Sequence, residues 1–125
     1  MNDYQKKLKQ KMDQYVHAVY RVVKKFPKDE LYGVTSQYRR AALSIVLNYI
    51  EGHGRGRELV KLNFFEISLG SYRESEYLSE FVLVEGYITK DEYESLHILE
   101  KEIGAMLWTD IQNLKEYCKK NGLKK

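Results

Sequence analysis

A chain of 125 residues with 43% hydrophobic and 31% charged residues has the composition of a folded globular protein, which excludes a disordered polypeptide. At this length we expect residues 1–125 to form one domain. The net charge of +3 is too small to require a nucleic-acid partner, although residues 1–28 carry eight Lys/Arg against two acids.

Three further features of the sequence indicate a cytoplasmic protein. Cys118 is the only cysteine and cannot form an intrachain disulfide, which fits a reducing compartment. No apolar run approaches the roughly 18–20 residues that span a bilayer, so we expect no membrane association. The polar N-terminus runs into lysines and has no apolar signal core behind it.

The first predicted helix covers about residues 3–25, where apolar residues recur at steps of three and four. Phe26-Pro27 ends it, because proline lacks a backbone donor and disfavours helix at the residue before it. The apolar positions are Leu8, Met12, Tyr15, Val16, Val19, Val22, Val23 and Phe26.

The second predicted helix begins at Thr35 or Ser36, either of which can cap it, and runs to about Gly52. A glycine-rich break over residues 52–56 follows, because three glycines in five residues interrupt a helix. A third helix is predicted over about residues 57–85 and stops near Gly86.

The fourth predicted helix opens with a capping box formed by Thr89 and Glu92, and ends near residues 121–122. We find no strand pattern and no internal repeat. Long helices with short connections predict an all-α fold, an antiparallel up-down-up-down four-helix bundle.

A narrow polar sector runs along the second helix at about 100° per residue. It includes Arg40, Ser44, Asn48 and Glu51, with Arg55 one turn further on. One interpretation is a polar surface or channel in an oligomer. The favoured interpretation is structural: Arg40 pairs with Glu51 or with Glu76 of the third helix, since buried charges must be paired.

The third helix carries two opposed apolar stripes, whereas a helix in a monomeric bundle needs one. The second stripe therefore predicts a surface buried by another subunit. The alternative is a tightly wrapped helix with some exposed aliphatic side chains. One stripe contains Leu62, Phe65, Leu69, Tyr72 and Leu83, and the predicted oligomer interface contains Val60, Phe64, Ile67, Leu78 and Val82.

Several segments of the chain match a known sequence pattern in the same order: residues 26–33, 35–45, Asn48, residues 51–55, Gly70-Ser71, Glu74, Glu76, residues 85–88 and Ile103-Gly104. Through these segments, about three quarters of the chain resembles the four-helix-bundle proteins encoded in intervening sequences of bacterial 23S ribosomal RNA genes. One departure is Val46-Leu47, where the family often has smaller residues such as Pro-Ala, so the second helix is expected to be more continuous here.

The resemblance implies an all-α fold and a ring-like homopentamer. A related group, the accessory variability determinants of diversity-generating retroelements, is similar in fold and binds nucleic acid and a reverse transcriptase. No catalytic activity is attached to either group, so the resemblance implies a binding role.

Basic residues near the ends of the first two helices are candidates for binding RNA or DNA phosphates. The glycine-rich break lacks the Gly-Lys-Ser/Thr ending of a phosphate-binding loop and follows no strand, so no nucleotide-hydrolase site is expected. The alternative is a flexible, solvated turn. The candidates are Arg39, Arg55, Arg57 and Lys61, helped by Lys24, Lys25 and Lys28.

The sequence predicts no metal, no cofactor, no small-molecule substrate and no catalysis. His17, His53 and His97 share no metal-ligand spacing. Glu74 and Glu76 are two residues apart and point to different helix faces, so they do not form an acid–base pair. No nucleophile motif is present.

The favoured reading is therefore a non-catalytic homo-oligomer that binds RNA or DNA through phosphate contacts. A second hypothesis is a protein-interaction scaffold that recruits a partner enzyme, such as a reverse transcriptase, without binding nucleic acid itself. A third is a passenger product with no strong binding activity.

Overall fold

The computed structural model describes residues 1–123 and contains four α-helices and one short 3₁₀ turn. The helices are α1 (Asp3–Val23), α2 (Val34–His53), α3 (Glu58–Val84) and α4 (Lys90–Lys120), and the turn η1 (Lys28–Glu30) lies between α1 and α2. No strand occurs among residues 1–123, which confirms the all-α prediction.

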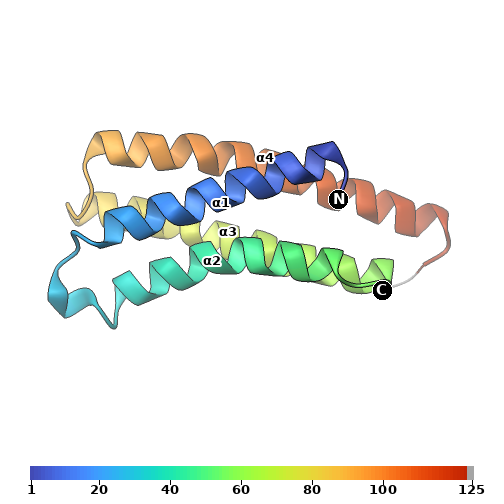
Figure 1. Ribbon diagram of the computed structural model, residues 1–125, viewed down its shortest axis with the longest axis horizontal. Coiled ribbons are helices and arrows are strands. Elements are labelled where there is room, and N and C mark those ends of the chain that lie inside the picture. The colour runs from blue at the N-terminus through green and yellow to red at the C-terminus, as the bar shows by residue number, and fades with distance from the viewer. Residues whose placement is uncertain (124–125) are drawn as a thin grey trace.

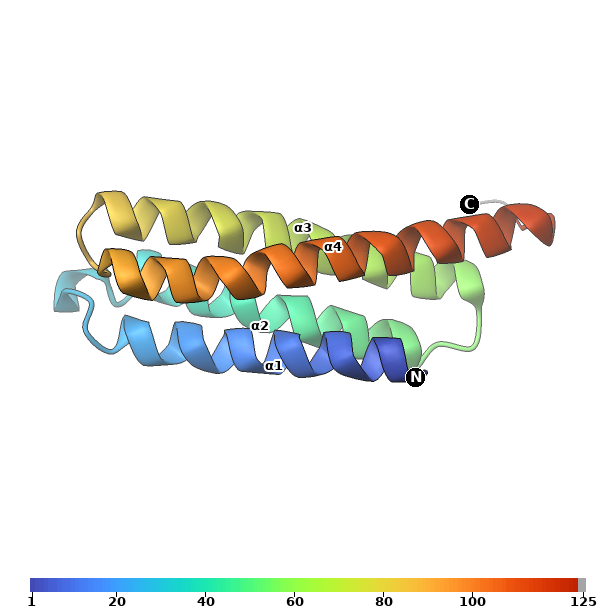
Figure 2. The same ribbon diagram turned by 90° about the horizontal axis from the view of Figure 1, so that it is seen from above.

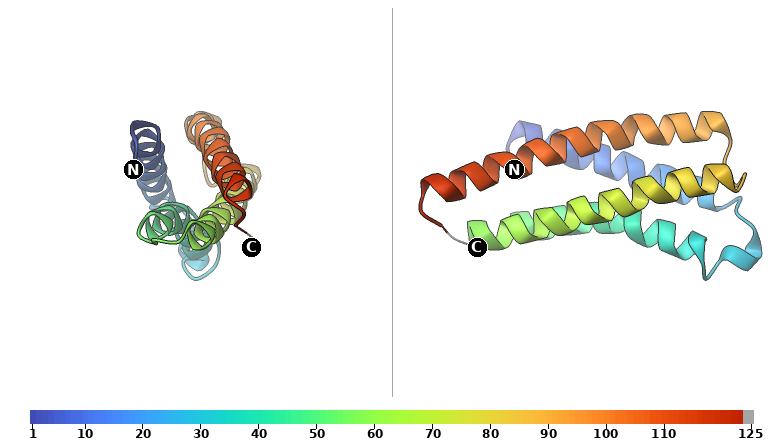
Figure 3. Two further views of the ribbon diagram at one scale, coloured as in Figure 1. Left: turned by 90° about the vertical axis from the view of Figure 1, so that its right-hand side faces the viewer. Right: turned by 180° about the vertical axis from the view of Figure 1, so that it is seen from behind.

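The helices lie around a common centre, as the end-on view in Figure 3 shows. Each helix packs on its neighbours in the chain, and α1 also packs on α4. The α1–α2 and α3–α4 connections lie at one end, called here the α1–α2 end (Figures 1 and 2). The glycine-rich turn between α2 and α3 lies at the other, called the α2–α3 end.

Two helices begin with complete capping boxes. At α1, Asn2 Oδ1 accepts from the Gln5 amide at 2.8 Å, and the Gln5 side chain accepts from the Asn2 amide at 3.0 Å. At α4, the same reciprocal bonds join Thr89 and Glu92 at 3.1 and 2.8 Å, as the sequence predicted. These bonds satisfy backbone donors that have no partner inside the helix.

The predicted start of α2 was wrong. Neither Thr35 nor Ser36 caps the helix; the capping position is Gly33, whose carbonyl accepts from the Gln37 amide at 3.0 Å. The Gly33 amide in turn donates to the Glu30 carbonyl at 3.0 Å, so the 3₁₀ turn leads directly into α2. Thr35 therefore lies inside the first helical turn and is buried.

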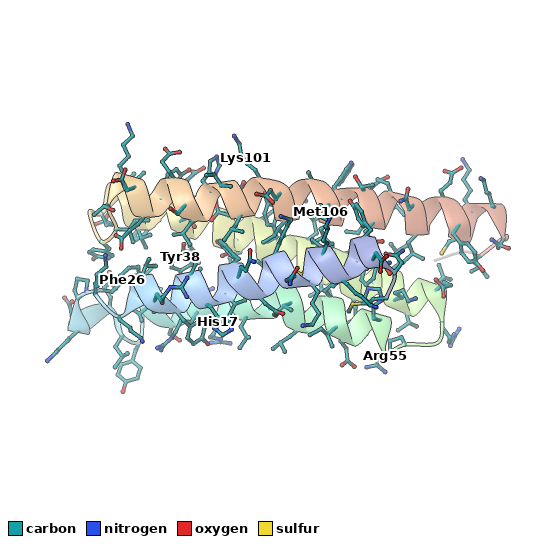
Figure 4. The ribbon with its side chains drawn as sticks, turned by 45° about the horizontal axis from the view of Figure 1, so that its top comes forward. His17, Phe26, Tyr38, Arg55, Lys101 and Met106 are labelled. Carbon is teal, nitrogen blue, oxygen red and sulfur yellow. The ribbon has the colours of Figure 1, made fainter. Side chains whose placement is uncertain are left out.

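The core fills the space between the four helices. All eight apolar positions predicted for the first helix are buried, which confirms its apolar face. Tyr38 and Tyr49 of α2 are fully buried, and α4 contributes Ile103 and Leu107. Figure 4 shows Tyr38 inside the bundle and Lys101 pointing outward from α4.

Candidate nucleic-acid interface

The predicted basic residues fall into two groups at opposite ends of the bundle. Figure 4 labels Phe26 near the α1–α2 end and Arg55 near the α2–α3 end. The first group is Lys24, Lys28 and Arg39; the second is Arg55, Arg57 and Lys61. The two groups differ in how far their charges are already neutralised.

At the α1–α2 end, Lys24, Lys28 and Arg39 line one cavity of about 440 Å³, and no acidic residue lines it. We call it the α1–α2 cavity. Lys24 lies at the C-terminal cap of α1, Lys28 in η1 and Arg39 on the second turn of α2. The Arg39 guanidinium carbon lies 5.9 Å from the centre of the Tyr20 ring, a cation–π distance that holds Arg39 at the rim.

Lys25 does not join this group, although the sequence placed it there. Its ammonium group forms an ion pair with Glu92 at the start of α4. The hydrogen bond from Lys25, together with that from the Thr89 amide, lowers the pKa of Glu92. One residue along a helix is about 100° of rotation, so Lys24 and Lys25 face different neighbours.

At the α2–α3 end, two of the three cations are paired within the chain. Arg55 forms an ion pair with Glu51 and lies 5.0 Å from the centre of the Phe64 ring. The Lys61 ammonium lies 3.7 Å from a Glu58 carboxylate oxygen. Arg57, the capping residue of α3, is exposed, and within residues 1–123 it has no ion pair. Within the described residues, this end therefore offers fewer unpaired cations than the α1–α2 end.

The polar sector of α2 faces outward along the α2–α3 contact, and Arg40 is not buried as the structural interpretation required. Arg40 is exposed and forms no ion pair with any of residues 1–123. Its two expected partners are engaged elsewhere: Glu51 with Arg55, and Glu76 with the Tyr72 hydroxyl at 3.1 Å.

The short polar groups of this sector do bridge helices. Ser44 Oγ lies 2.8 Å from Ser71 Oγ of α3, and Asn48 donates to the Ser44 carbonyl at 2.9 Å. Nearer the α1–α2 end, Gln37 donates to Glu74 of α3. These contacts hold α2 against α3 and leave the Arg40 guanidinium free at the edge of the contact.

The predicted second stripe of α3 is divided by the structure. Val82 is fully buried and Leu78 is 9% exposed, so both belong to the core of the single chain, contrary to the prediction. Val60 and Phe64 are half-buried, and Ile67 is 51% exposed. The buried side of α3 changes along its 27 residues, from Leu62 and Phe65 near the start to Leu78 and Val82 near the end. A stripe drawn at constant angle therefore passes from the surface into the core.

Leu47 of α2 is a second exposed aliphatic side chain beside Ile67, the exposed member of that stripe. Each lies about one turn from the Ser44–Ser71 contact, on α2 and α3 respectively, toward the α2–α3 end. Leu47 is 53% exposed. We call Arg40, Leu47 and Ile67 the α2–α3 face; it combines an unpaired cation with aliphatic side chains.

A buried polar cluster that the sequence analysis missed lies between all four helices. The Glu100 carboxylate of α4 is fully buried and accepts from the hydroxyls of Tyr15 (2.7 Å) and Ser79. Tyr38 contacts Ser79, and His97 Nδ1 lies 3.3 Å from the other carboxylate oxygen. Burial raises the pKa of Glu100, and the bonds from Ser79, Tyr15 and His97 oppose that rise.

The sequence held a signal for this cluster, because Glu100 falls among Leu96, Ile103 and Leu107 on the apolar face of α4. Glu76, His97 and Glu100 each have one potential metal-binding atom, and these three atoms lie within 4.8 Å of one another. The group comes from α3 and α4, so residue spacing along one helix does not reveal it. The hydroxyls of Tyr15 and Ser79 already donate to one Glu100 oxygen, so we interpret the cluster as a structural hydrogen-bond network that joins the helices.

The geometry agrees with comparisons to known proteins. Residues 5–109 match the family model described as 23S rRNA-intervening sequence protein. The chain belongs to this family. The match confirms the resemblance found in the sequence and covers all of α2 and α3.

A solved structure is also similar to this 23S rRNA-intervening sequence protein. It is the crystal structure of a protein of unknown function from the S23 ribosomal protein family of Bacteroides thetaiotaomicron, 25% identical, with a TM-score of 0.77. The similarity covers 83% of this chain and 97% of that one. No curated protein matches the chain. Among residues 1–123, no helix is both long and apolar enough to cross a membrane.

Proposed function

We propose that this 23S rRNA-intervening sequence protein is a non-catalytic, cytoplasmic homo-oligomer that binds RNA or DNA through phosphate contacts at the α1–α2 end. The observation that carries the proposal is the convergence of Lys24, Lys28 and Arg39 on one cavity that no acid lines. Cations without carboxylate partners bind phosphates at the least cost, since no internal ion pair has to break.

Self-association strengthens the proposal. The up-down-up-down bundle offers the α2–α3 face, where Leu47 and Ile67 are more than half exposed beside unpaired Arg40, as a contact for a second copy. A ring-like pentamer, the assembly that the family resemblance implies, would present about fifteen cavity cations on one particle. Binding to a multiply charged RNA would then be steeply salt-dependent.

The test compares charge-matched variants by fluorescence anisotropy with a structured RNA and a DNA duplex between roughly 50 and 200 mM salt. If Lys24 and Lys28 each contact one phosphate, the double alanine variant should flatten the slope of log affinity against log salt by about 1.8 for duplex DNA. The matched control removes Arg73 and Lys101, which are exposed in the middle of α3 and α4, and should leave the slope unchanged.

A third variant, Arg55→Ala with Arg57→Ala, tests the α2–α3 end. If this variant has a flatter slope and the slope of Lys24→Ala/Lys28→Ala is unchanged, the interface lies at the α2–α3 end instead. If the wild-type protein retains neither RNA nor DNA at roughly 50 mM salt, the nucleic-acid proposal fails.

A scaffold that recruits a partner enzyme is the second candidate function, and one observation favours it. Tyr32 is 94% exposed and Tyr77 is 63% exposed, and with Val34 and Phe81 they line a groove of about 380 Å³. Exposed tyrosines are common at protein interfaces. The genomic neighbourhood separates the candidates: a gene beside a reverse transcriptase favours the scaffold, and one within a ribosomal RNA gene favours nucleic-acid binding.

A further inference from the structure

The α1–α2 cavity has a second property besides its charge: much of its wall is apolar. Val23, Phe26 and Leu31 line it between the three cations. Phe26 is 7% exposed, and its ring is fixed by packing on Tyr38 and Tyr87 at centroid distances of 6.4 and 5.4 Å. The volume of the α1–α2 cavity, about 440 Å³, lies within the roughly 300–1,000 Å³ range of small-molecule sites.

Thr35 places an unsatisfied polar group in the wall of this cavity. The residue lines the cavity and is only 5% exposed, and its Oγ1 is itself closed off from solvent and has no hydrogen-bond partner among residues 1–123. Buried hydroxyl groups almost always have a partner, because removing one from water without a replacement bond is costly. Within the described residues, the one comparable atom is His53 Nε2, at the opposite end of the bundle.

The charge around Thr35 is positive on several sides. Lys24, Lys28 and Arg39 line the same cavity, and neither acid of the adjacent 3₁₀ turn, Asp29 or Glu30, lines it; Glu30 accepts from the Tyr87 hydroxyl at 2.9 Å. An occupant therefore needs three properties together: a flat or apolar body, an edge that hydrogen-bonds to a hydroxyl, and negative charge outside the cavity.

We propose that the α1–α2 cavity receives one unpaired nucleotide of a nucleic-acid strand. The base enters the apolar part, and rotation of the Thr35 side chain about χ1 turns its hydroxyl from the cavity wall toward the edge of the base. The flanking phosphates lie on Lys24 and Lys28. Unstacked bases are commonly held by aromatic rings or arginine planes, and Phe26 and the Arg39–Tyr20 pair offer both. This inference rests on the proposed function and adds to it a preference for unpaired over duplex strands.

The preference has a physical cause. A base in a duplex uses its edge for pairing and both faces for stacking, so it enters a cavity only after unpairing. A base in a loop has already lost that pairing. Phosphate contacts alone do not distinguish a duplex from a loop, because paired and unpaired nucleotides carry the same phosphates.

The experiment uses the full chain and two RNA probes of equal length and charge: a hairpin with 2-aminopurine in an unpaired loop, and a fully paired duplex. We expect the hairpin to bind about ten-fold more tightly than the duplex and its 2-aminopurine fluorescence to change on binding. Thr35→Val, which keeps the side-chain shape, should remove most of that preference. Ser36→Ala is the matched control, since Ser36 does not line the cavity.

The stability of Thr35→Val gives a second readout. Because Oγ1 has no partner within the described chain, the variant should melt at or above the wild-type temperature. A clear drop in melting temperature would show that the hydroxyl bonds within the protein and would overturn the proposal, as would equal hairpin binding by variant and wild type.

The remaining outcomes separate this inference from the proposed function. Equal affinity of the wild-type protein for hairpin and duplex, with a steep salt slope, refutes base insertion and leaves phosphate binding standing. No retention of either probe refutes both. Displacement of the hairpin by polyglutamate at equal charge concentration would make the cavity a general anion site and also refute base insertion.

Discussion

Removing one hydroxyl from the buried Glu100 cluster should produce a loss of stability that grows with pH. Tyr15→Phe deletes a group that lies 2.7 Å from Glu100 Oε2 and 2.7 Å from Ser75 Oγ. Burial raises the pKa of Glu100 in the folded state. The carboxyl group's contribution to the free energy of unfolding is therefore fully present below the unfolded pKa of about 4.3 and is lost as the pH rises through the folded pKa. The Tyr15 bond opposes that loss, because it stabilises the ionised form.

The size of the effect follows from the charge on the acceptor. With Glu100 protonated, the lost bond is between neutral groups and costs about 1 kcal/mol. With Glu100 ionised, a bond to a charged group is lost and the cost rises to about 2–3 kcal/mol. Urea unfolding near pH 4.5 and pH 8 should show midpoint shifts of about 0.5 M and about 1–1.5 M at a typical slope of about 2 kcal/mol per molar.

Two further variants decide between this reasoning and simple loss of packing. Tyr87→Phe removes a hydroxyl that bonds the carboxylate of half-buried Glu30 and should shift the urea midpoint less than Tyr15→Phe does at either pH. In the Glu100→Gln background, the cost of Tyr15→Phe should no longer depend on pH. An equal loss at both pH values in the parent protein would refute the reasoning.

Three other substitutions test separate parts of the structure. A Cβ at Gly104 would overlap the Tyr72 hydroxyl, so Gly104→Ala should destabilise by about 1–3 kcal/mol in thermal unfolding, whereas Gly70→Ala, with open space around it, should stabilise by about 0.5–1 kcal/mol. Arg40→Ala should change the stability of the single chain by less than about 0.5 kcal/mol, since the side chain is exposed. Ile67→Asp should reduce the light-scattering mass of the oligomer to 14.8 kDa without unfolding it; a wild-type protein already at that mass refutes self-association.

Much of the fold could be predicted from the sequence because helix signals are local. The apolar repeat of the first helix, the Phe26-Pro27 stop and the Thr89–Glu92 capping box each depend on residues within a turn or two of one another. The start of α2 could not be predicted in this way. Capping propensity favours Thr35 or Ser36, but the 3₁₀ turn before them places the start of the helix earlier, with Gly33, two residues before Thr35, at the capping position.

The candidate site was predicted less well, because it depends on which residues meet from different helices. The basic character of Lys24 and Lys25 is equal in the sequence, and only the position of Glu92 on α4 separates a free cation from a paired one. Arg40 was expected to be buried because the residues around it are apolar, yet its sector points outward past the Ser44–Ser71 contact.

The bond between Tyr15 and Glu100 joins residues 85 positions apart and links the first helix to the last. During synthesis, the part of α1 that packs on α4 therefore stays uncovered until α4 has left the ribosome. At about 5–20 residues per second, the 31 residues of α4 take about 2–6 s to make. For those seconds the nascent chain exposes the apolar surface of α1 and α3 that α4 covers in the folded protein.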